Sequence, residues 1–130
     1  MTPSSTSEAP AWALRIDQLL PLYGHRNWIV VVDSAYPSQS RVGIETILTH
    51  STQEAVVEHT LGRIQKTPHI RPLIHVDAEL DFVHDHAAQT FSILILKTTM
   101  TIPYTSVFFQ LDCAYWDAAS ETRLRAAMST

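Results

Sequence analysis

Trp28-Ile29-Val30-Val31-Val32 is the stretch that decides the fold class of this 130-residue chain. All of its residues are apolar, and three of them are valines. A continuous apolar run, in contrast to an alternating one, is typical of a strand covered on both faces, as in a parallel or mixed sheet. The run therefore predicts a central strand of a layered domain.

Helices are predicted both before and after this strand in the sequence. An apolar stripe at helical spacing indicates a helix that begins near Pro10 and ends before Pro21. Ser51-Thr52-Gln53-Glu54 matches a capping box, and it predicts a second helix that ends before Pro68. A short amphipathic helix is expected to open near Asp117.

Further apolar segments predict the rest of the sheet. We expect strands at 43–48, 73–76, 91–96 and 107–111, while 82–89 is ambiguous. Strands that alternate with helices predict a single three-layer α/β domain, with a mixed, mostly parallel sheet flanked by helices. The domain is expected to span 10–130, after a loose polar tail at 1–9.

Composition and charge narrow the classes of function. Hydrophobic residues make up 45% of the chain and charged residues 17%, which is typical of a packed globular protein. The net charge is −4 and the basic residues form no run, so we expect no nucleic-acid partner. Cys113 is the only cysteine, which excludes an internal disulfide and a cysteine-based zinc site.

Targeting signals are not recognisable in the sequence. Residues 1–8 have neither a basic start nor an apolar run, so no signal peptide is predicted. The apolar stretches are far shorter than a membrane span, so we expect no membrane partner. The prediction is a soluble cytoplasmic protein.

Two polar residues lie at the ends of the apolar strand. Gly24-His25 immediately precedes it and Asp33 immediately follows it, and loops at strand ends are where α/β sheets place ligand groups. Histidine transfers protons near neutral pH, and aspartate accepts hydrogen bonds from two hydroxyls at once. The alternative is a capping or turn role for each, since Asp33-Ser34 is an ordinary turn opener.

Other candidates lie in the second half of the chain. Tyr104, with hydroxyl residues around it, suits a polar face for a sugar, and its alternative role is to cover the edge of the core. His84 and His86, with His75 on a nearby strand, suggest a zinc or iron site. Because no HExxH or comparable spacing is present, a solvated polar loop is favoured, and no metal is predicted.

Two blocks of sequence resemble the D-ribose pyranase and L-fucose mutarotase family. Leu22 to Pro37 is similar to the family's Gly-His, apolar strand, Asp-Ala-x-x-Pro block, and Tyr36 is closer to the fucose branch. Within 93–111, Lys97-Thr98 and Pro103-Tyr104 are similar to the family's Arg-Thr and Pro-Tyr-x-Asn elements. Together the blocks cover about a quarter of the chain.

The resemblance implies an isomerase that interconverts anomers or ring forms of a free monosaccharide, without a metal or cofactor. His25 falls on the family's proton-donating histidine, and Asp33 and Tyr104 fall on sugar-binding positions. His84 lies near a position that is His in the ribose branch and Arg in the fucose branch. Ser106 takes the place of the asparagine in the family's Tyr-x-Asn element.

This chain departs from the family pattern at the second block. Besides Ser106, Thr99-Met100 replaces the usual Gly-Glu. A serine offers one polar atom fewer than an asparagine. These departures imply either a changed sugar preference or a lost activity, so a catalytically degenerate monosaccharide-binding protein is the alternative function. A metal-dependent enzyme that uses His75, His84 and His86 is a more distant one.

Strand geometry gives a prediction about assembly. A strand rises about 3.3 Å per residue, so the Cα atoms of His25 and Asp33 are expected roughly 20–26 Å apart. One monosaccharide does not span that distance. If both residues contact one sugar they come from different subunits, which head-to-tail contacts in a closed ring provide. The resemblance likewise implies a ring-shaped homo-oligomer, often a decamer, with sites between subunits.

Overall fold

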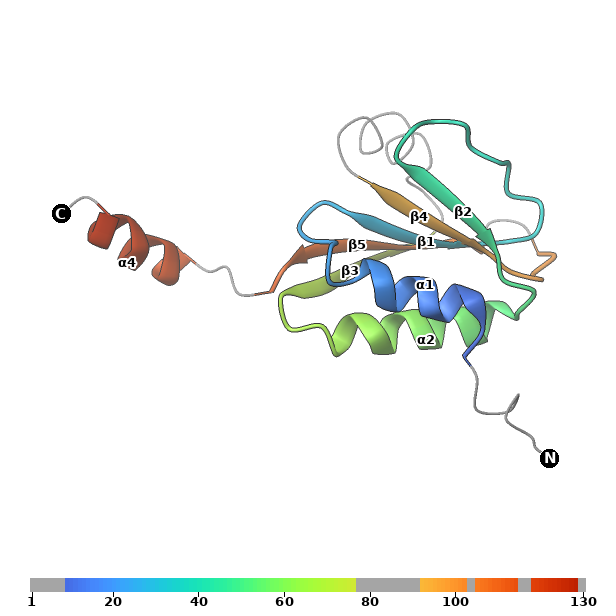
Figure 1. Ribbon diagram of the computed structural model, residues 1–130, viewed down its shortest axis with the longest axis horizontal. Coiled ribbons are helices and arrows are strands. Elements are labelled where there is room, and N and C mark those ends of the chain that lie inside the picture. Colours follow the sequence, from blue (N-terminus) through green and yellow to red (C-terminus); the bar gives the residue numbers. More distant parts are fainter. Residues whose placement is uncertain (1–8, 77–91, 103–104, 115–117, 129–130) are drawn as a thin grey trace.

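The apolar run at 28–32 forms the middle strand of a five-stranded sheet, whose order is β2-β4-β1-β5-β3 (Figure 1). β1 (Trp28–Val32) pairs in parallel with β4 (Ile93–Lys97), and β4 pairs in parallel with β2 (Ile44–Leu48). On its other side β1 pairs with β5 (Val107–Cys113) in the antiparallel sense, and β5 pairs likewise with β3 (Ile70–Val76). The chain is therefore a single α/β domain with a mixed sheet.

The share of parallel pairing is smaller than predicted. The structure is a computed structural model that describes residues 9–76, 92–102, 105–114 and 118–128. Two of its strand pairs are parallel and two are antiparallel, so the sheet is mixed but not mostly parallel. The connection between β4 and β5 is shorter than the dozen or so residues that a parallel crossover needs, and β5 accordingly returns in the opposite direction.

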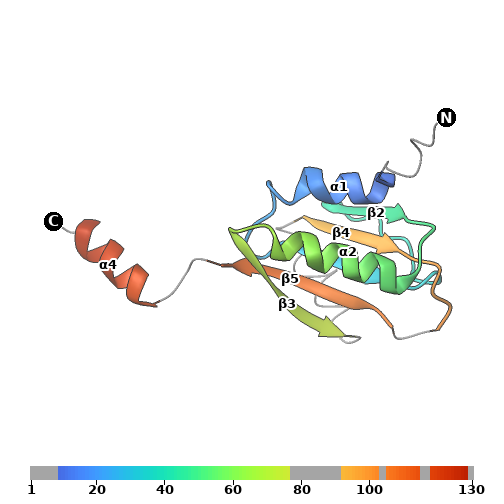
Figure 2. The same ribbon diagram turned by 90° about the horizontal axis from the view of Figure 1, so that it is seen from below.

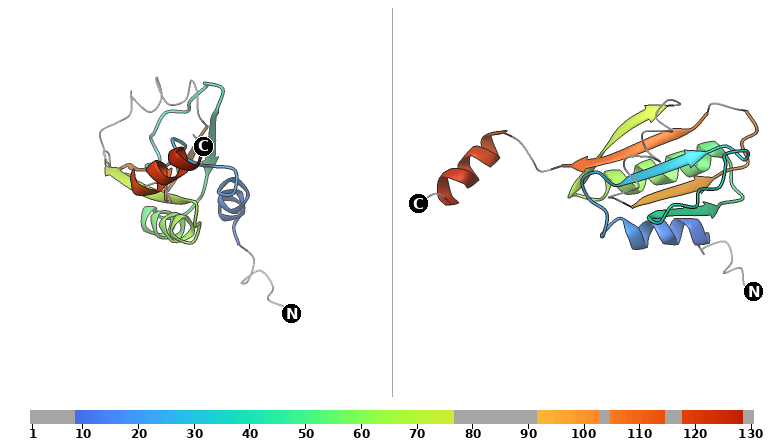
Figure 3. Two further views of the ribbon diagram at one scale, coloured as in Figure 1. Left: turned by 90° about the vertical axis from the view of Figure 1, so that its left-hand side faces the viewer. Right: turned by 90° about the horizontal axis from the view of Figure 1, so that it is seen from above.

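Two helices cover one face of the sheet. α1 (Ala11–Leu19) and α2 (Gln53–Gln65) lie on the same side of the strands (Figure 2). Seen from the opposite side, the strands lie in front of α2 (Figure 3). α4 (Ala118–Met128) lies apart from the sheet (Figure 1). The side chains at 122–128 are exposed. None of the described helices has the length and apolar character needed to cross a membrane.

Both faces of β1 are buried, which confirms the prediction from its continuous apolar run. Ile29 and Val31 pack on the helix side, in a cluster of α1, α2 and sheet residues that also includes Trp12, Ile16, Val56, Ile64, Leu94, Leu96, Phe109 and Leu111. Trp28, Val30 and Val32 pack on the opposite side with Tyr36 and Phe108. No helix within the described stretches covers that second face, so the third layer stays a prediction.

The predicted capping box is wrong. The N-cap of α2 is Thr52, whose hydroxyl accepts a hydrogen bond from the Ala55 amide at 3.2 Å. Ser51 is engaged elsewhere, because its hydroxyl donates to the Thr49 carbonyl at 3.1 Å and its own carbonyl accepts from the Thr99 amide at 2.9 Å. The Thr99 bond ties the β2–α2 connection to the end of β4, and Ser51 lies one residue before the N-cap.

The other predicted elements are present with shifted limits. β2 and β4 begin at Ile44 and Ile93, slightly later than expected. β3 begins at Ile70, before Pro72, and β5 continues to Cys113. A proline is tolerated in β3 because this strand is at the edge of the sheet. The ambiguous segment 82–89 and the tail at 1–8 lie outside the described residues.

Candidate functional site

The direction of β1 places the two main candidates at opposite ends of the sheet. His25 lies in the turn before β1, and Asp33 follows the strand directly. The strand between them spans roughly 17 Å at 3.3 Å per residue. One chain therefore does not bring His25 and Asp33 together, and the site predicted from them needs a second copy.

His25 is paired with a carboxylate that the sequence did not reveal. Its Nδ1 atom lies 2.9 Å from Oδ1 of Asp112, near the end of β5. The His25 side chain is 53% exposed, whereas that of Asp112 is 17% exposed. Arg71 of β3, the register partner of Asp112, donates to Oδ2 of this carboxylate from Nε at 2.8 Å and from a terminal nitrogen at 2.7 Å. The three side chains form one connected cluster.

Hydrogen bonds fix the turn that carries His25. The Gly24 amide donates to the side-chain oxygen of Asn27 at 2.8 Å, and the Asn27 amide donates to the Gly24 carbonyl at 3.1 Å. The Asn27 side-chain nitrogen donates to the Ser92 carbonyl at 3.0 Å, next to β4. Arg26, with a φ of 79°, donates its amide to Leu111 of β5. The turn is thus attached to both strands that flank β1.

The charge of Asp112 is stabilised by its neighbours. The Arg71 hydrogen bond is the main cause that lowers the pKa of Asp112, and the Cys113 amide and the charges of Arg71 and His25 add to it against an opposing effect of burial. Asp112 is therefore a carboxylate at neutral pH, and a carboxylate only accepts hydrogen bonds. Nδ1 of His25 faces this acceptor at 2.9 Å, so Nε2 is the ring nitrogen left for a ligand.

More polar side chains lie on the same face of the sheet. Gln110 precedes Asp112 by two residues on β5, and His75 follows Arg71 by four on β3, so period-two alternation puts them all on one face. The His75 Nε2 atom lies 3.1 Å from the Gln110 side-chain oxygen, and the His75 ring lies 5.7 Å from Trp28. The described stretches contain no group of three or more His, Cys, Asp or Glu residues able to hold a metal.

His84 and His86, the other members of the possible metal site, lie outside the described residues, as does Tyr104. The two remaining sugar-binding candidates are described. The Asp33 carboxylate accepts a hydrogen bond from the Ala35 amide at 2.9 Å, so it has the turn role that was its alternative. Ser106 is only 7% exposed, which leaves little of it accessible to a ligand.

Buried hydrogen bonds connect the elements at the Asp33 end. The Thr98 hydroxyl lies 2.7 Å from the Gln53 side-chain oxygen and 3.0 Å from the Val32 carbonyl. The Gln53 side-chain nitrogen donates to the Thr105 carbonyl at 2.7 Å. Thr98 and Gln53 therefore hold the start of α2 and the segment before β5 against the end of β1.

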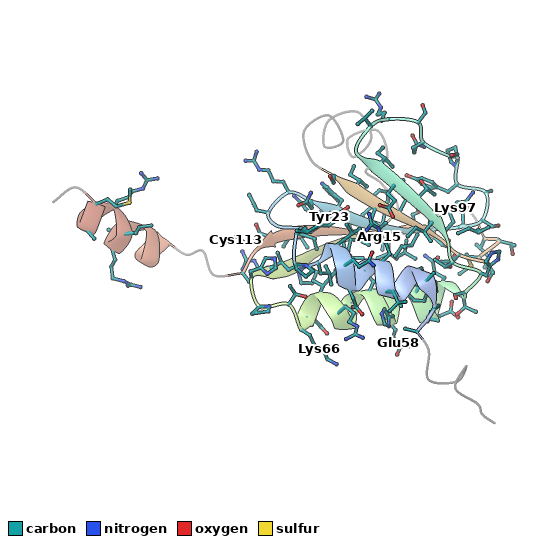
Figure 4. The ribbon with its side chains drawn as sticks, viewed as in Figure 1. Arg15, Tyr23, Glu58, Lys66, Lys97 and Cys113 are labelled. Atoms are coloured by element: carbon teal, nitrogen blue, oxygen red, sulfur yellow. The ribbon has the colours of Figure 1, made fainter. Side chains whose placement is uncertain are left out.

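A surface hollow of about 260 Å³ lies beside α1 and β2, and it contains none of the predicted site residues. Arg15 and Glu45 line it and neutralise each other through two hydrogen bonds of 2.7 Å. Tyr23 also lines it, close to Arg15 (Figure 4), and burial, with a smaller effect of Glu45, raises the pKa of Tyr23 to about 12. With its charges paired, this hollow offers less chemistry than the His25 cluster.

No family model matches the chain, and no curated protein sequence matches it either. The mutarotase interpretation thus rests on the two sequence blocks and on the geometry of the residues within them. Asp112 and Arg71 belong to neither the predicted site nor the sequence argument. Asp112 follows an apolar segment directly in the sequence. This position would have indicated a site only if the antiparallel pairing of that segment with β1 had been predicted as well.

Proposed function

We propose that this protein is a monosaccharide mutarotase or pyranase, an isomerase that interconverts anomers or ring forms of a free fucose-like or ribose-like sugar without a cofactor. The observation that carries the proposal is the exposed imidazole of His25, which lies in the turn before β1. Asp112 of β5 contacts the Nδ1 atom of this ring and orients it. Nε2 is then available for proton transfer. Histidine suits this role because it exchanges protons near neutral pH.

The reaction needs one proton given and one removed. With both ring nitrogens protonated, His25 donates the proton on Nε2 to the ring oxygen of the sugar while the bond between that oxygen and the anomeric carbon breaks. The anomeric hydroxyl gives its proton to water or a carboxylate, and its oxygen becomes the aldehyde oxygen. Closure by the reverse steps, on either face or through another hydroxyl, forms the second anomer or ring size. Positioned proton transfer of this kind contributes about 10²–10⁴-fold.

In this proposal His25 of one subunit acts on a sugar that a neighbouring subunit binds. The binding residues lie at the end of the sheet opposite to the His25 end. Asp33 and Tyr104 bind sugar hydroxyls, with Ser106 and His84 as further contacts. The support for a shared site is the position of His25 and Asp33 at opposite ends of β1. A ring-shaped homo-oligomer, such as a decamer, supplies the required contact at each junction.

Saturation-transfer NMR with ribose, fucose and related sugars tests the activity. Wild-type protein should accelerate exchange between anomers, and His25→Ala should abolish the acceleration by losing the proton donor. Because His25 is more than half exposed, the variant should unfold at the wild-type temperature. The matched control is Glu58→Gln on the exposed side of α2, which should exchange at the wild-type rate (Figure 4). Unchanged exchange in His25→Ala would reject the proposal.

Mixed oligomers test the shared site. His25→Ala and Asp33→Asn subunits are each expected to be inactive alone. When they are unfolded and refolded together at equal amounts, about one quarter of the junctions combine an intact His25 with an intact Asp33, if the subunits assemble at random. Recovery of about a quarter of the wild-type exchange rate supports a site between subunits. No recovery from a mixed oligomer of normal size contradicts it.

A monosaccharide-binding protein without turnover is the second candidate. The observations that favour it are the departures from the family pattern at Thr99-Met100 and Ser106. Saturation-difference NMR that detects sugar binding, with no accelerated anomer exchange, would support this function. Metal analysis of the purified protein separates these two functions from that of a metal-dependent enzyme, which would contain bound metal.

A further inference from the structure

We infer that Asp112 is a positioning residue for His25, and that Arg71 holds the Asp112 carboxylate in place for this role. The inference rests on the proposed function only for its catalytic consequence. Its structural content, which is the tautomer and orientation of the His25 ring, stands or falls independently of any sugar.

The first step is the tautomer of His25. The 2.9 Å contact joins Nδ1 to an oxygen that only accepts hydrogen bonds, so the neutral imidazole carries its proton on Nδ1. Nε2 then has the lone pair. An imidazole without such a partner is free to place the proton on either nitrogen. Asp112 thus leaves Nε2 as the nitrogen that gives a proton to the sugar and takes one back.

The second step is the placement of the carboxylate. Both Arg71 donors contact Oδ2, at 2.8 and 2.7 Å, whereas His25 contacts Oδ1. The two partners therefore do not compete for one oxygen. Because Asp112 and Arg71 are register partners on β5 and β3, the sheet itself sets the distance between them. Arg71 therefore holds the carboxylate independently of His25.

The third step is the charge during the reaction. The Asp112 carboxylate lies 2.9 Å from Nδ1 of the ring that exchanges protons with the sugar. The hydrogen bond from Arg71 lowers the pKa of Asp112 and so keeps it a carboxylate beside the ring. Asp112 of β5 therefore contacts His25 directly, and Arg71 of β3 contacts Asp112. Asp112 orients and stabilises His25 without touching the sugar.

Nitrogen-15 NMR of the His25 ring tests the inference without any substrate. Near pH 8, wild-type protein should show a predominant Nδ1–H tautomer for His25, and Asp112→Ala should shift the population toward Nε2–H. The matched control is Asp17→Ala, which removes the carboxylate of another exposed ion pair, 3.2 Å from Arg63, and should leave the His25 signals unchanged. A predominant Nε2–H tautomer in the wild type would overturn the inference.

A second experiment measures the catalytic consequence. Asp112→Asn should lower the anomer-exchange rate about 10-fold to 100-fold, the range typical when the partner that orients an imidazole is removed. Arg71→Met should lower the rate less, and Arg63→Met should leave it unchanged. A wild-type rate in Asp112→Asn contradicts the positioning role.

The two experiments separate the possible failures. If the tautomer is as expected but wild-type protein accelerates no exchange, the proposed function fails while the orientation of His25 by Asp112 stands. If exchange is rapid in the wild type and in Asp112→Asn, the function stands and the positioning role fails. Should Asp112→Asn unfold, Arg71→Gln serves as the second variant, because it retains Asp112 and removes only the paired donors.

Discussion

Replacing the buried Thr98 by valine should destabilise the protein more than the same replacement of an exposed threonine. Thr98 is 1% exposed, and Gln53 is 7% exposed. The Thr98 hydroxyl lies 2.7 Å from the Gln53 side-chain oxygen. Valine has nearly the same shape but no hydroxyl, so Thr98→Val tests this buried hydrogen bond with little change in packing.

The expected cost follows from two contributions. The net loss of one hydrogen bond costs about 1 kcal/mol. The Gln53 oxygen is then buried without its partner, and an unsatisfied buried polar group costs about 1–3 kcal/mol. We expect Thr98→Val to lower the free energy of unfolding by about 2–4 kcal/mol in total, since water has little access to Gln53.

Urea unfolding followed by circular dichroism measures this cost at fixed protein concentration. With an m-value of about 1–3 kcal/mol per molar urea, the midpoint should fall by about 0.7 M or more. The control is Thr46→Val on β2, because Thr46 is exposed. A double-mutant cycle with Gln53→Met should give a double variant less destabilised than the sum of the single ones. A Thr98→Val cost equal to that of Thr46→Val, or an additive cycle, would refute the reasoning.

Two more predictions concern α2 and α4. Burial, aided by Arg63, lowers the pKa of His59. Below about pH 6.5 the unfolded chain therefore binds more protons than the folded one. The free energy of unfolding should fall as the pH is lowered through this range. His59→Gln should reduce this slope in urea titrations at pH 5–8, whereas exposed His50→Gln should retain it; equal slopes would contradict the assignment. Deletion of 118–130 should leave the urea midpoint unchanged, because the α4 side chains at 122–128 are exposed, and a lower midpoint would show that α4 packs on the protein.

The fold could be predicted where burial dominates the sequence pattern. Trp28–Val32 is a strand in both the prediction and the structure, because a short run without polar residues has to be covered on both faces. Local capping chemistry was less informative. Ser51 and Thr52 are both good N-caps, and the structure uses Thr52, while the Ser51 carbonyl accepts from the distant Thr99 amide, a bond that no local pattern contains.

The candidate site was predictable only in its local part. His25 and Asp33 were found because they flank a recognisable strand. Asp112 was missed because aspartate is rare in strands, so the predicted strand ended at Leu111. Its importance depends on the antiparallel pairing of β5 with β1 and β3, which brings Arg71 and His25 to it. Sequence periodicity does not distinguish this pairing from a parallel one.

The direction of β5 also decides how the proposed site must be assembled. Because β5 is antiparallel to β1, its end at Asp112 lies beside His25, and its beginning, after Ser106, lies at the same end of the sheet as Asp33. Each chain thus has a proton-transfer end and a separate end with binding candidates. A site that uses both ends requires at least two chains, either as a two-fold pair or as a ring in which each subunit contacts two neighbours. A monomeric particle with full exchange activity would contradict the shared site, while the pairing of His25 with Asp112 would remain.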